Sequence, residues 1–434
     1  MFAGLPMMKP AVPKSVRHWK QAARKWSKRL RRWQALTPLP GKKRSPWQFW
    51  EEQAMKTIDE AIRLRPDGFT DRSIYTDPAV LEQEIEKIFK KAWVLIGHET
   101  EVPEPGDYVR KTIAGQPLIQ VRGNDGKVRV VYNTCRHRAS LVAIEEEGNC
   151  AKTNFVCPYH GFEYSADGDL VKVPVADGYG EWFKNEEFGL VELAQFDTFN
   201  GMVFGSFNPD AQPLVDYLSS AKEFIDYATK GDGEDLVLVD SYKYDIAGNW
   251  KLLIDNTMDG YHVPYVHGSM FEQFGISAEE GISGIARTLG FHGSIDWDEG
   301  RPMAERNVNR YMAIFPNITV HYNASGDMFA IRQIEPLNVD NMQVTMWLLA
   351  PKSTASREMN ERRAAAFTIT WGPGGLFGAD DARQLEWVQL GMKADCGAPV
   401  LAARGLETGD EDDWENEQSM RGFRAGWNHY MNQD

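Results

Sequence analysis

Cysteine and long apolar runs are both scarce in this sequence. Only 4 of its 434 residues are cysteines, which is too few for a disulfide framework and fits a chain that works in the reducing cytoplasm. No apolar run approaches the roughly 18 residues of a membrane-spanning helix. No Gly-x-Gly-x-x-Gly pattern follows a predicted strand, so the chain lacks a dinucleotide-binding signature. What is left is a globular chain, 42% hydrophobic and 25% charged, that is long enough for two domains.

Positive charge is concentrated at the N-terminus, although the net charge is −14. Residues 1–54 hold 13 Lys and Arg against 2 Asp and Glu, whereas the rest of the chain holds 35 against 60. The acidic body is unsuited to nucleic acid as a main partner. The basic stretch has the composition of an interfacial helix or of a transit-like segment. We expect instead a disordered extension that precedes a working start at Met55.

Cysteine and histidine alternate on two short segments. Cys135-x-His137 is followed, after nineteen residues, by Cys157-x2-His160. Zinc fingers usually take two cysteines from one loop and two histidines from the other, whereas here each loop supplies one of each. This distribution favours a Rieske [2Fe–2S] cluster, with cysteine on one iron and histidine on the other, over tetrahedral zinc. Cys150 lies between the loops without a histidine neighbour, and we expect a buried thiol there.

A second candidate metal site lies farther along, where Asp259-x2-His262-x4-His267 follows a predicted helix that begins at Asn249. Five residues are a poor spacing for two ligands on a regular helix. Pro264 lies between the histidines and should kink or end the helix, which would let both rings converge. Taken alone, the pair also fits two ordinary histidines near a helix end.

Secondary-structure patterns divide the chain into a small β-rich unit and a larger mixed unit. Apolar residues recur at three- and four-residue steps over Leu81–Trp93, which predicts a helix with Asp77 as its cap. Short runs of β-forming residues predict strands at residues 108–113, 117–122, 128–133, 203–207, 236–246, 318–322, 329–335 and 344–349. Turn signals lie at residues 124–126, 200–201 and 325–327.

Two charged features near the C-terminal end admit both structural and functional interpretations. Arg332 lies in an apolar strand, where an inward-facing guanidinium needs an anion or a carboxylate neighbour; a solvent-facing side chain or an internal salt bridge is the alternative. Asp380 and Asp381 follow a Gly-Pro-Gly-Gly break and fall in the first turn of a predicted helix. Acidic groups favour the helix dipole at that position whatever else they do.

Both metal motifs, in this order, resemble the large (α) subunit of Rieske non-haem iron aromatic-ring-hydroxylating oxygenases. The resemblance covers the chain from about residue 71 to the C-terminus and excludes the basic extension. Asn249-Trp250-Lys251 and the paired aspartates agree with it, and the tail Ser-Met-Arg-Gly-Phe at residues 419–423 is similar to the benzoate, salicylate and terephthalate branch. The nineteen-residue spacing is slightly longer than the family's, in the loop that carries Cys150.

That resemblance implies roles for the cluster residues. Cys135 and Cys157 would bind one iron of the cluster, and His137 and His160 would bind the other. Replacing two thiolates by neutral imidazoles makes the cluster less negative and raises its reduction potential.

The resemblance also implies a mononuclear Fe(II) held by His262, His267 and Asp381, the second member of its acidic pair. This 2-His-1-carboxylate set leaves coordination positions open for O2. Asp259 would bind no iron; it would bridge His262 to His160 of the partner subunit, orienting the ligand and carrying the electron.

The implied fold is α+β, with an all-β Rieske [2Fe–2S] domain at residues 92–208 inserted in a catalytic domain. That domain, residues 55–91 and 209–434, would contain an antiparallel β-sheet flanked by helices. The implied partners are an aromatic substrate, O2, and a ferredoxin or reductase that draws electrons from NAD(P)H. The implied assembly is a homotrimer or an α3β3 complex with a small β subunit.

The tail resemblance favours an aromatic carboxylate as substrate, of the benzoate, salicylate, anthranilate or terephthalate type. Arg332 could pair with that carboxylate, and the product would be a cis-dihydrodiol, or a phenol if one oxygen leaves as water. Apolar residues that equally fit a pocket lining and core packing are Met258, Val263, Ile314 and Phe315. Competing interpretations are a Rieske monooxygenase or demethylase, a non-catalytic electron-transfer Rieske protein, and a colourless zinc module in place of a red-brown cluster.

Overall fold

The structure is a computed structural model that describes residues 68–229, 234–268, 284–297, 309–323, 328–407, 409 and 411–433. The described residues all belong to one compact unit that begins at Lys56. The basic extension at residues 1–54 and the turn predicted at residues 325–327 lie outside these ranges. Within them, no helix is long and apolar enough to cross a membrane.

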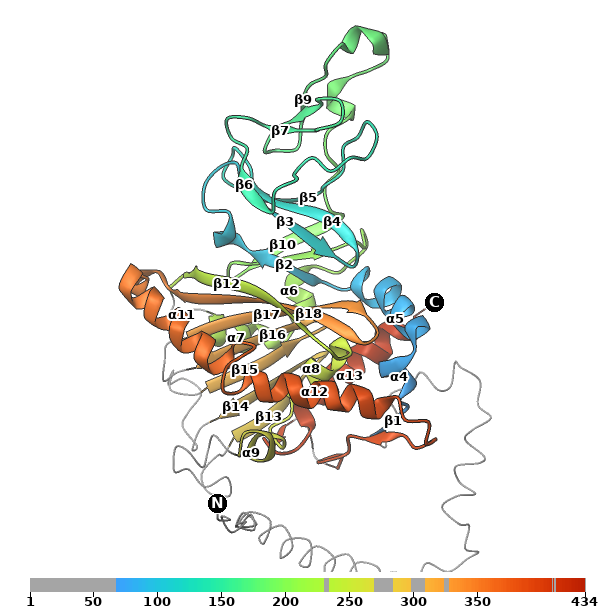
Figure 1. Cartoon of the computed structure of the whole chain (residues 1–434), viewed down its shortest axis with the longest axis vertical. Coiled ribbons are helices and arrows are strands. Elements are labelled where there is room, and N and C mark those ends of the chain that lie inside the picture. The colour runs from blue at the N-terminus through green and yellow to red at the C-terminus, as the bar shows by residue number, and fades with distance from the viewer. Residues whose placement is uncertain are drawn as a thin grey trace, which may run out of the picture. The chain divides into compact units, whose positions relative to one another are not determined.

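Three small antiparallel sheets occupy residues 94–206 (Figure 1). Their strand orders are β5-β4-β3-β6, β7-β8-β9 and β10-β11-β2. The strands are β2 (Val94–His98), β3 (Asp107–Ile113), β4 (Gln116–Arg122), β5 (Val128–Tyr132), β6 (Glu147–Asn149), β7 (Phe155–Val156), β8 (Glu163–Tyr164), β9 (Leu170–Lys172), β10 (Gln195–Phe199) and β11 (Met202–Ser206). Short 3₁₀ helices lie at η2 (Glu99–Glu101), η3 (Ala176–Tyr179) and η4 (Asn185–Glu187). The predicted hairpin joins β4 to β5, with Gly126 at a φ of 80°.

An eight-stranded sheet forms the centre of the larger unit, and every pair of neighbouring strands in it is antiparallel. Its order is β12-β18-β17-β16-β15-β14-β13-β20. The strands are β12 (Leu236–Ile246), β13 (Gly284–Leu289), β14 (His292–Trp297), β15 (Asn309–Ile314), β16 (Ile318–Asn323), β17 (Met328–Asn338), β18 (Asn341–Pro351) and β20 (Glu411–Asp413). All four strands predicted between residues 236 and 349 fall in this sheet.

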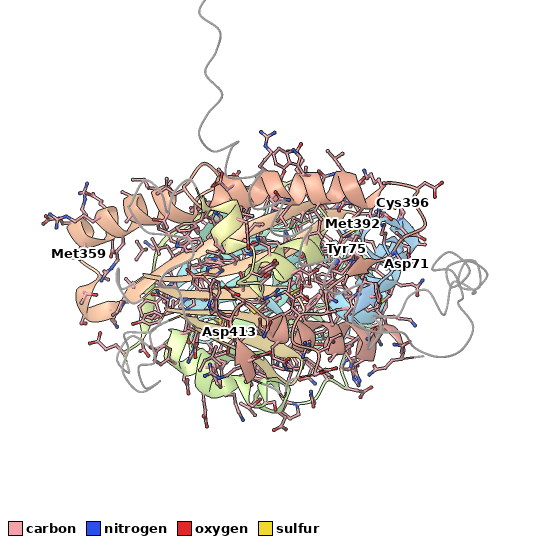
Figure 2. All side chains as sticks on the ribbon, turned by 90° about the horizontal axis from the view of Figure 1, so that it is seen from below. Asp71, Tyr75, Met359, Met392, Cys396 and Asp413 are labelled. Atoms are coloured by element: carbon pink, nitrogen blue, oxygen red, sulfur yellow. The ribbon has the colours of Figure 1, made fainter. Side chains whose placement is uncertain are left out.

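Helices pack around this sheet. They are α4 (Ser73–Thr76), α5 (Pro78–Glu84), the π-helix η1 (Ile85–Phe89), α6 (Leu214–Leu218), α7 (Ala221–Thr229), α8 (Trp250–Thr257), α9 (Val263–Val266), the 3₁₀ helix η5 (Lys352–Thr354), α11 (Arg357–Trp371), α12 (Gly378–Met392) and α13 (Gln418–Met431). Figure 2 shows α11 and α12 running along one side of the sheet, from Met359 to Met392. Asp71 and Tyr75 of the N-terminal segment lie near the end of α12.

The N-terminal segment packs with the C-terminal part of the chain, so the β-rich unit is an insertion. Strand β1 (Phe69–Thr70) pairs antiparallel with β19 (Val400–Leu401). The Arg72 guanidinium donates from Nη1 to the carbonyl of Gly391 at 3.1 Å. The predicted architecture, an all-β unit inserted in an α+β domain with an antiparallel sheet, is confirmed.

The helix predicted over residues 81–93 ends earlier than the apolar pattern suggests. Helix α5 passes into the π-helix η1, which closes with a hydrogen bond from the Lys90 amide to the Ile85 carbonyl at 3.0 Å. Trp93 donates its indole N–H to the carbonyl of Gln212 at 2.8 Å. Because β2 begins at Val94 and pairs with β11, the chain must straighten before that residue.

A buried ion pair ties α8 to the N-terminal segment. Lys251 Nζ lies 2.7 Å from Glu84 Oε1, and the side chains are 1% and 0% exposed. The Glu84 carboxylate also accepts two hydrogen bonds from indole N–H groups: Trp427 donates to Oε1 at 2.7 Å, and Trp250 donates to Oε2 at 2.8 Å. This network fixes the helix that leads directly to the Asp-x2-His-x4-His motif.

We expect Lys251→Met to lower the free energy of unfolding by about 3–5 kcal/mol, because it leaves the Glu84 carboxylate buried without its cation. Urea unfolding measures this loss. Glu84→Gln combined with Lys251→Met should recover most of it, since neither partner then carries a charge. A loss below about 1 kcal/mol for the single variant would mean that the Lys251–Glu84 pair stabilises the protein no more than a surface ion pair does. That result would contradict this prediction.

A second buried carboxyl group lies where the β-rich unit meets the eight-stranded sheet. Glu335 Oε1 accepts a hydrogen bond from the Ala114 amide at 2.8 Å, and Oε2 is buried without a partner. Burial raises the pKa of Glu335 to about 8, although the Ala114 N–H opposes this shift. The folded protein therefore keeps a proton on Glu335 that the unfolded chain releases at a lower pH.

The protein should lose stability as the pH rises from the ordinary Glu pKa to about 8. In that window the folded state binds more protons than the unfolded state, so the free energy of unfolding falls by at most about 1.4 kcal/mol per pH unit. Glu335→Gln keeps an acceptor for Ala114 and removes the titration. Urea unfolding at about pH 6 and about pH 8 should show a smaller loss in the variant than in the wild type; equal losses would exclude Glu335 as the source.

Candidate metal centres

The four cluster candidates lie on two loops that are built in the same way. In each loop the Cys amide donates to the carbonyl five residues later at 2.8 Å, and the amide four residues after the Cys donates back at 2.9 Å. The residues at that fourth position, Ala139 and Gly161, have positive φ angles of 57° and 70°. Each loop therefore turns back on itself and keeps its Cys and His close together. Neither turn was predicted from the sequence; a glycine adopts this conformation readily at Gly161, whereas Ala139 adopts it in spite of its Cβ.

The ligand atoms on these loops suit two metal ions better than one. The Cys135 and Cys157 thiols are free and buried, and the His137 and His160 ring centroids lie 4.4 Å apart. No three of these four residues bring their ligand atoms within 4.8 Å of one another, as a single tetrahedral zinc requires. A cluster with thiolates on one iron and imidazoles on the other needs no common point. The four residues fit a Rieske cluster.

Cys135 and Cys150 have different surroundings in this unit. The Tyr164 hydroxyl lies 3.2 Å from Cys135 Sγ and accepts a hydrogen bond from the Arg136 amide at 3.0 Å. Hydrogen bonds to the ligand sulfurs are one means by which a protein sets a cluster's potential. Cys150 is 2% exposed, and burial raises the pKa of its thiol to about 11. The expectation of a buried thiol at Cys150 is confirmed.

The chain breaks between α8 and α9 to position the two histidines of the second motif. Helix α8 ends at Thr257, and His262 and His267 flank the four-residue α9. The prediction that the helix kinks or ends at Pro264 is wrong about the position. Helix α8 has already ended at Thr257, and Pro264 lies in the first turn of α9. The break falls beside Gly260, where an added Cβ would lie 2.0 Å from the Trp414 ring.

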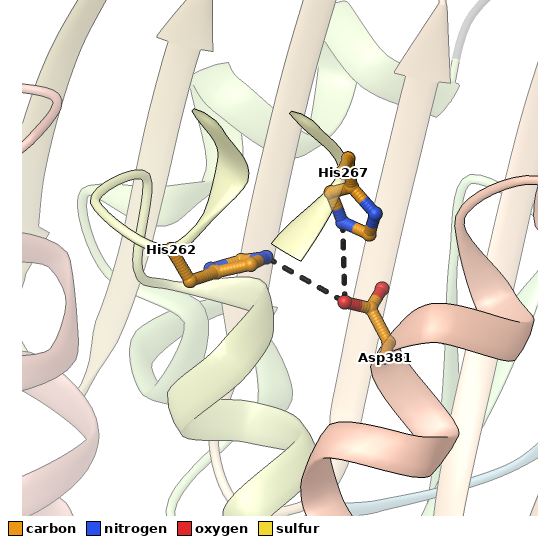
Figure 3. Close-up of side chains that lie close together, drawn as sticks. All are labelled: His262, His267 and Asp381. Carbon is orange, nitrogen blue, oxygen red and sulfur yellow. Dashed lines mark ion pairs between the residues drawn. The ribbon is translucent and has the colours of Figure 1, made fainter. Parts of the chain in front are cut away.

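One carboxylate oxygen meets both imidazoles (Figure 3). Asp381 Oδ1 lies 3.2 Å from His267 Nε2 and 3.6 Å from His262 Nε2. The ligand atoms of all three residues lie within 4.8 Å of one another. Two imidazoles and one carboxylate that converge in this way are the ligand set of non-haem Fe(II) oxygenases.

The charges at this site also suit a divalent cation. The pKa of His262 is raised. Burial acts in the opposite direction, but the carboxylates of Asp259 and Asp381 outweigh it. Burial likewise opposes the shift at Asp381, whose pKa is lowered by its hydrogen bond to His267 and by the charges of both histidines. The anionic carboxylate is therefore favoured, and the space between the three groups is one where positive charge is stabilised.

Asp380 and Asp381 differ in burial and in the nitrogen of His267 that each carboxylate approaches. Both lie in the first turn of α12, but the Asp380 side chain is 45% exposed and that of Asp381 is 12% exposed. Asp380 Oδ2 lies 3.7 Å from His267 Nδ1, the nitrogen on the far side of the ring from Asp381. Asp381 is thus the carboxylate that converges with both histidines.

Two further polar residues contact this group. Asn256 Nδ2 donates to Asp381 Oδ1 at 3.2 Å and lies 3.2 Å from His262 Nε2. No sequence signal pointed to Asn256, because its contact with Asp381 arises only when α8 packs against α12. Asp259 Oδ2 lies 3.7 Å from His262 Nδ1, and its side chain is 24% exposed. Asp259 thus lies between His262 and the protein surface.

The apolar residues considered for a substrate pocket have packing contacts. Met258, Ile314 and Phe315 are at most 1% exposed. The Phe315 ring stacks on Tyr430, with centroids 5.5 Å apart, and contacts two other rings of the core. Val263 packs against the small cluster that contains Trp414. Burial and these contacts fit core packing, and a part of these residues in a substrate pocket stays a prediction.

Arg332 is different, because its guanidinium has no carboxylate partner among the described residues. It is 6% exposed, Nη2 lies 3.1 Å from His321 Nδ1, and Nε has no partner. By contrast, Arg287 and Arg310, which are buried in the same sheet, both pair with Asp296 at 2.5 and 2.6 Å.

Aromatic rings connect Arg332 to the histidines. The guanidinium lies 6.0 Å from the Trp371 ring centroid. Trp371 stacks on Phe377 at 4.8 Å, and Phe377 contacts His267 at 4.8 Å. Burial raises the pKa of Tyr311, the charge of Arg332 lowers it and that of Asp381 raises it, so the two charged groups act on one buried ring. Arg332 faces the side of the sheet that carries the metal ligands.

Comparison with known proteins identifies the family. Residues 92–193 match the Rieske [2Fe–2S] domain, and residues 234–433 match the ring hydroxylating alpha subunit (catalytic domain). The large subunit of 2-halobenzoate 1,2-dioxygenase from Burkholderia cepacia is 31% identical over 366 residues, 74% of this chain and 77% of that protein. The chain belongs to the Rieske ring-hydroxylating oxygenase large subunits.

Other members of the family agree. The alpha subunit of toluate 1,2-dioxygenase from Pseudomonas putida is 28% identical over 364 residues, 74% of this chain and 78% of that protein. The crystal structure of naphthalene 1,2-dioxygenase from Rhodococcus sp. has a TM-score of 0.78 at 27% identity, over 89% of this chain and 98% of that one. This oxygenase is therefore an enzyme with a Rieske cluster and a mononuclear iron site.

Proposed function

We propose that this oxygenase hydroxylates the ring of an aromatic carboxylate, with electrons that come from NAD(P)H through a separate ferredoxin or reductase. Arg332 is the observation that carries the proposal. A guanidinium that is 6% exposed and lacks a carboxylate partner within the described chain needs an anion. The 2-halobenzoate and toluate dioxygenases, which are named for aromatic acids, support the same class of substrate.

The chain's own residues orient the ring. When bound, the mononuclear iron supplies open positions for O2 activation, and the Rieske cluster supplies electrons one at a time. His262, His267 and Asp381 would hold that iron. Arg332 anchors the substrate carboxylate, while Trp371 and Phe377, which lie between Arg332 and His267, offer flat apolar surfaces to the ring. The carboxylate is thereby held away from the metal ligands, and a ring carbon is presented to them.

We further propose that Asp259 carries the electron between subunits. Its Oδ2 faces His262 Nδ1 at 3.7 Å, and its partial exposure leaves it open to another chain. In a trimer, it would accept a hydrogen bond from His160 of the partner subunit. The cluster of one subunit would then serve the iron of the next.

The substrate proposal is tested at Arg332. We expect Arg332→Ala to raise KM for benzoate about 10- to 100-fold, because a hydrogen-bonded charge contact to the carboxylate is lost, and to raise KM for toluene far less. Steady-state product formation with reductase and ferredoxin measures both. Arg357→Ala, at a residue whose side chain is 93% exposed on α11, serves as the control. Equal effects on the acid and the neutral arene would remove Arg332 from the substrate site.

A further inference from the structure

The Asp259 carboxylate is held by the turn that follows it. Asp259 Oδ1 accepts a hydrogen bond from the Tyr261 amide at 2.7 Å, and Oδ2 lies 3.7 Å from His262 Nδ1. An aspartate that accepts from the amide two residues later closes an Asx turn, which restricts the direction of its second oxygen. The position of the Tyr261 backbone therefore helps to decide whether Oδ2 faces His262.

Two residues of this turn contact a segment of the chain that is remote in sequence. Gly260 packs so closely on Trp414 that an added Cβ would lie 2.0 Å from the Trp414 ring and 2.4 Å from its carbonyl oxygen. The Arg404 guanidinium lies over the Tyr261 ring, 4.0 Å from the ring centroid. The turn is thus supported from one side by packing and from the other by a cation–π contact.

Arg404 is itself held at both of its backbone groups and at its guanidinium. Its amide donates to Glu417 Oε2 at 2.9 Å, and its carbonyl accepts from Arg421 Nη2 at 2.8 Å. Its Nε donates to the Glu415 carbonyl at 2.9 Å. Arg421 belongs to the tail motif at residues 419–423, so one contact of that motif fixes Arg404. These hydrogen bonds keep the guanidinium in one place, and it can therefore restrict the Tyr261 ring.

We propose that Arg404 is a positioning residue for electron transfer, which acts on Asp259 through Tyr261. This inference rests on the proposed function, in which Asp259 carries the electron between subunits. Tyr261 is 36% exposed and the Arg404 side chain is 40% exposed, so their contact lies at the protein surface. A cation–π contact at an exposed site corresponds to about a 2- to 5-fold change in an equilibrium. Without it, Oδ2 faces His262 in a correspondingly smaller fraction of the molecules.

Four variants separate the cation from the ring. Arg404→Lys keeps a cation that can lie over Tyr261, whereas Arg404→Met keeps an apolar chain and removes the charge. Tyr261→Phe keeps the ring, whereas Tyr261→Leu removes it. The rate at which O2 and benzoate reoxidise a chemically reduced cluster is measured by rapid mixing on the holoenzyme, together with its iron content. Arg357→Met, at a side chain that is 93% exposed on α11, is the matched control.

We expect Arg404→Met and Tyr261→Leu each to slow reoxidation about 2- to 5-fold at wild-type iron content, whereas Arg404→Lys and Tyr261→Phe stay within about 1.5-fold of the wild type. Arg404→Met should add no further loss to Asp259→Asn, because the residue that it positions has then already been changed. These two results together would establish that Arg404 acts through Asp259.

Three outcomes would overturn the proposal: a wild-type rate in Arg404→Met, an equal loss in Arg404→Lys, or an added loss in the Asp259→Asn background. Loss of the mononuclear iron from Arg404→Met would also overturn it, since Arg404 would then support the metal site rather than the electron route. A wild-type rate in Asp259→Asn at full iron content would instead refute the electron route of the proposed function.

Discussion

Asp381→Ala should abolish product formation, with a loss of more than about 100-fold, because it removes a metal ligand rather than a supporting hydrogen bond. Asp381 Oδ1 is the oxygen that lies within 3.6 Å of both histidine Nε2 atoms. The variant should lose the iron that is present beyond the two irons of the cluster. The red-brown colour of the cluster should remain, since the Rieske loops lie in a separate part of the chain. Iron analysis, the visible spectrum and product assay check the three statements together.

Asp380→Ala is the matched control for this experiment. The two residues are adjacent in the first turn of α12, and the helix loses one acidic group in either variant. Asp380 is 45% exposed and faces the opposite nitrogen of His267 at 3.7 Å. We expect Asp380→Ala to retain the mononuclear iron and most of the activity. Loss of iron in Asp380→Ala but not in Asp381→Ala would exchange the roles of the two residues.

Asp259→Asn should uncouple the two metal centres without emptying either. The carboxylate, 3.7 Å from His262 Nδ1, is replaced by a neutral amide of the same size. We expect the rate at which O2 and substrate reoxidise a pre-reduced cluster to fall by at least about 10- to 100-fold, the usual effect of removing a group that orients a metal ligand. Rapid mixing of the chemically reduced protein with O2 and benzoate measures this rate directly.

Asp240→Asn, on an exposed position of β12, controls for the loss of one surface charge. Iron content and the cluster spectrum should be unchanged in both variants. If Asp259→Asn loses the mononuclear iron, then Asp259 supports metal binding. If it reoxidises at the wild-type rate with full iron content, the electron takes another route.

Local patterns predicted the features of this protein that depend on local chemistry. The alternation of Cys and His on two loops indicated a Rieske cluster, because the distribution of ligands over the loops is itself the chemical signal. Strand β12 matched its predicted range, residues 236–246, since a run rich in β-forming residues fills it and Ala247-Gly248 follows its last residue. Four strands of the eight-stranded sheet, β12, β16, β17 and β18, were predicted in this way, whereas β13, β14, β15 and β20 were not.

Contacts that depend on how the elements pack could not be predicted from the sequence. Asn256 reaches Asp381 only through the contact of α8 with α12, residues that are 125 positions apart. His321 lay within a predicted strand, where a single histidine has no distinctive neighbour, and its contact with Arg332 arises only when β16 pairs with β17. The end of α8 was misplaced because the sequence shows Pro264 clearly, whereas the close approach of Gly260 to Trp414 is visible only in three dimensions.

The most direct test of the account is a single turnover of the purified holoenzyme with ¹⁸O2. The cluster is reduced chemically, and benzoate, salicylate, toluene and naphthalene are offered in turn, with products analysed by mass spectrometry. We predict ¹⁸O bound to a ring carbon of an aromatic acid, as a cis-dihydrodiol or a phenol, in a higher yield than any product of the neutral arenes. Turnover of the neutral arenes but not of the acids, or oxygen incorporated only into a side chain, would contradict an oxygenase built around Arg332 for aromatic carboxylates.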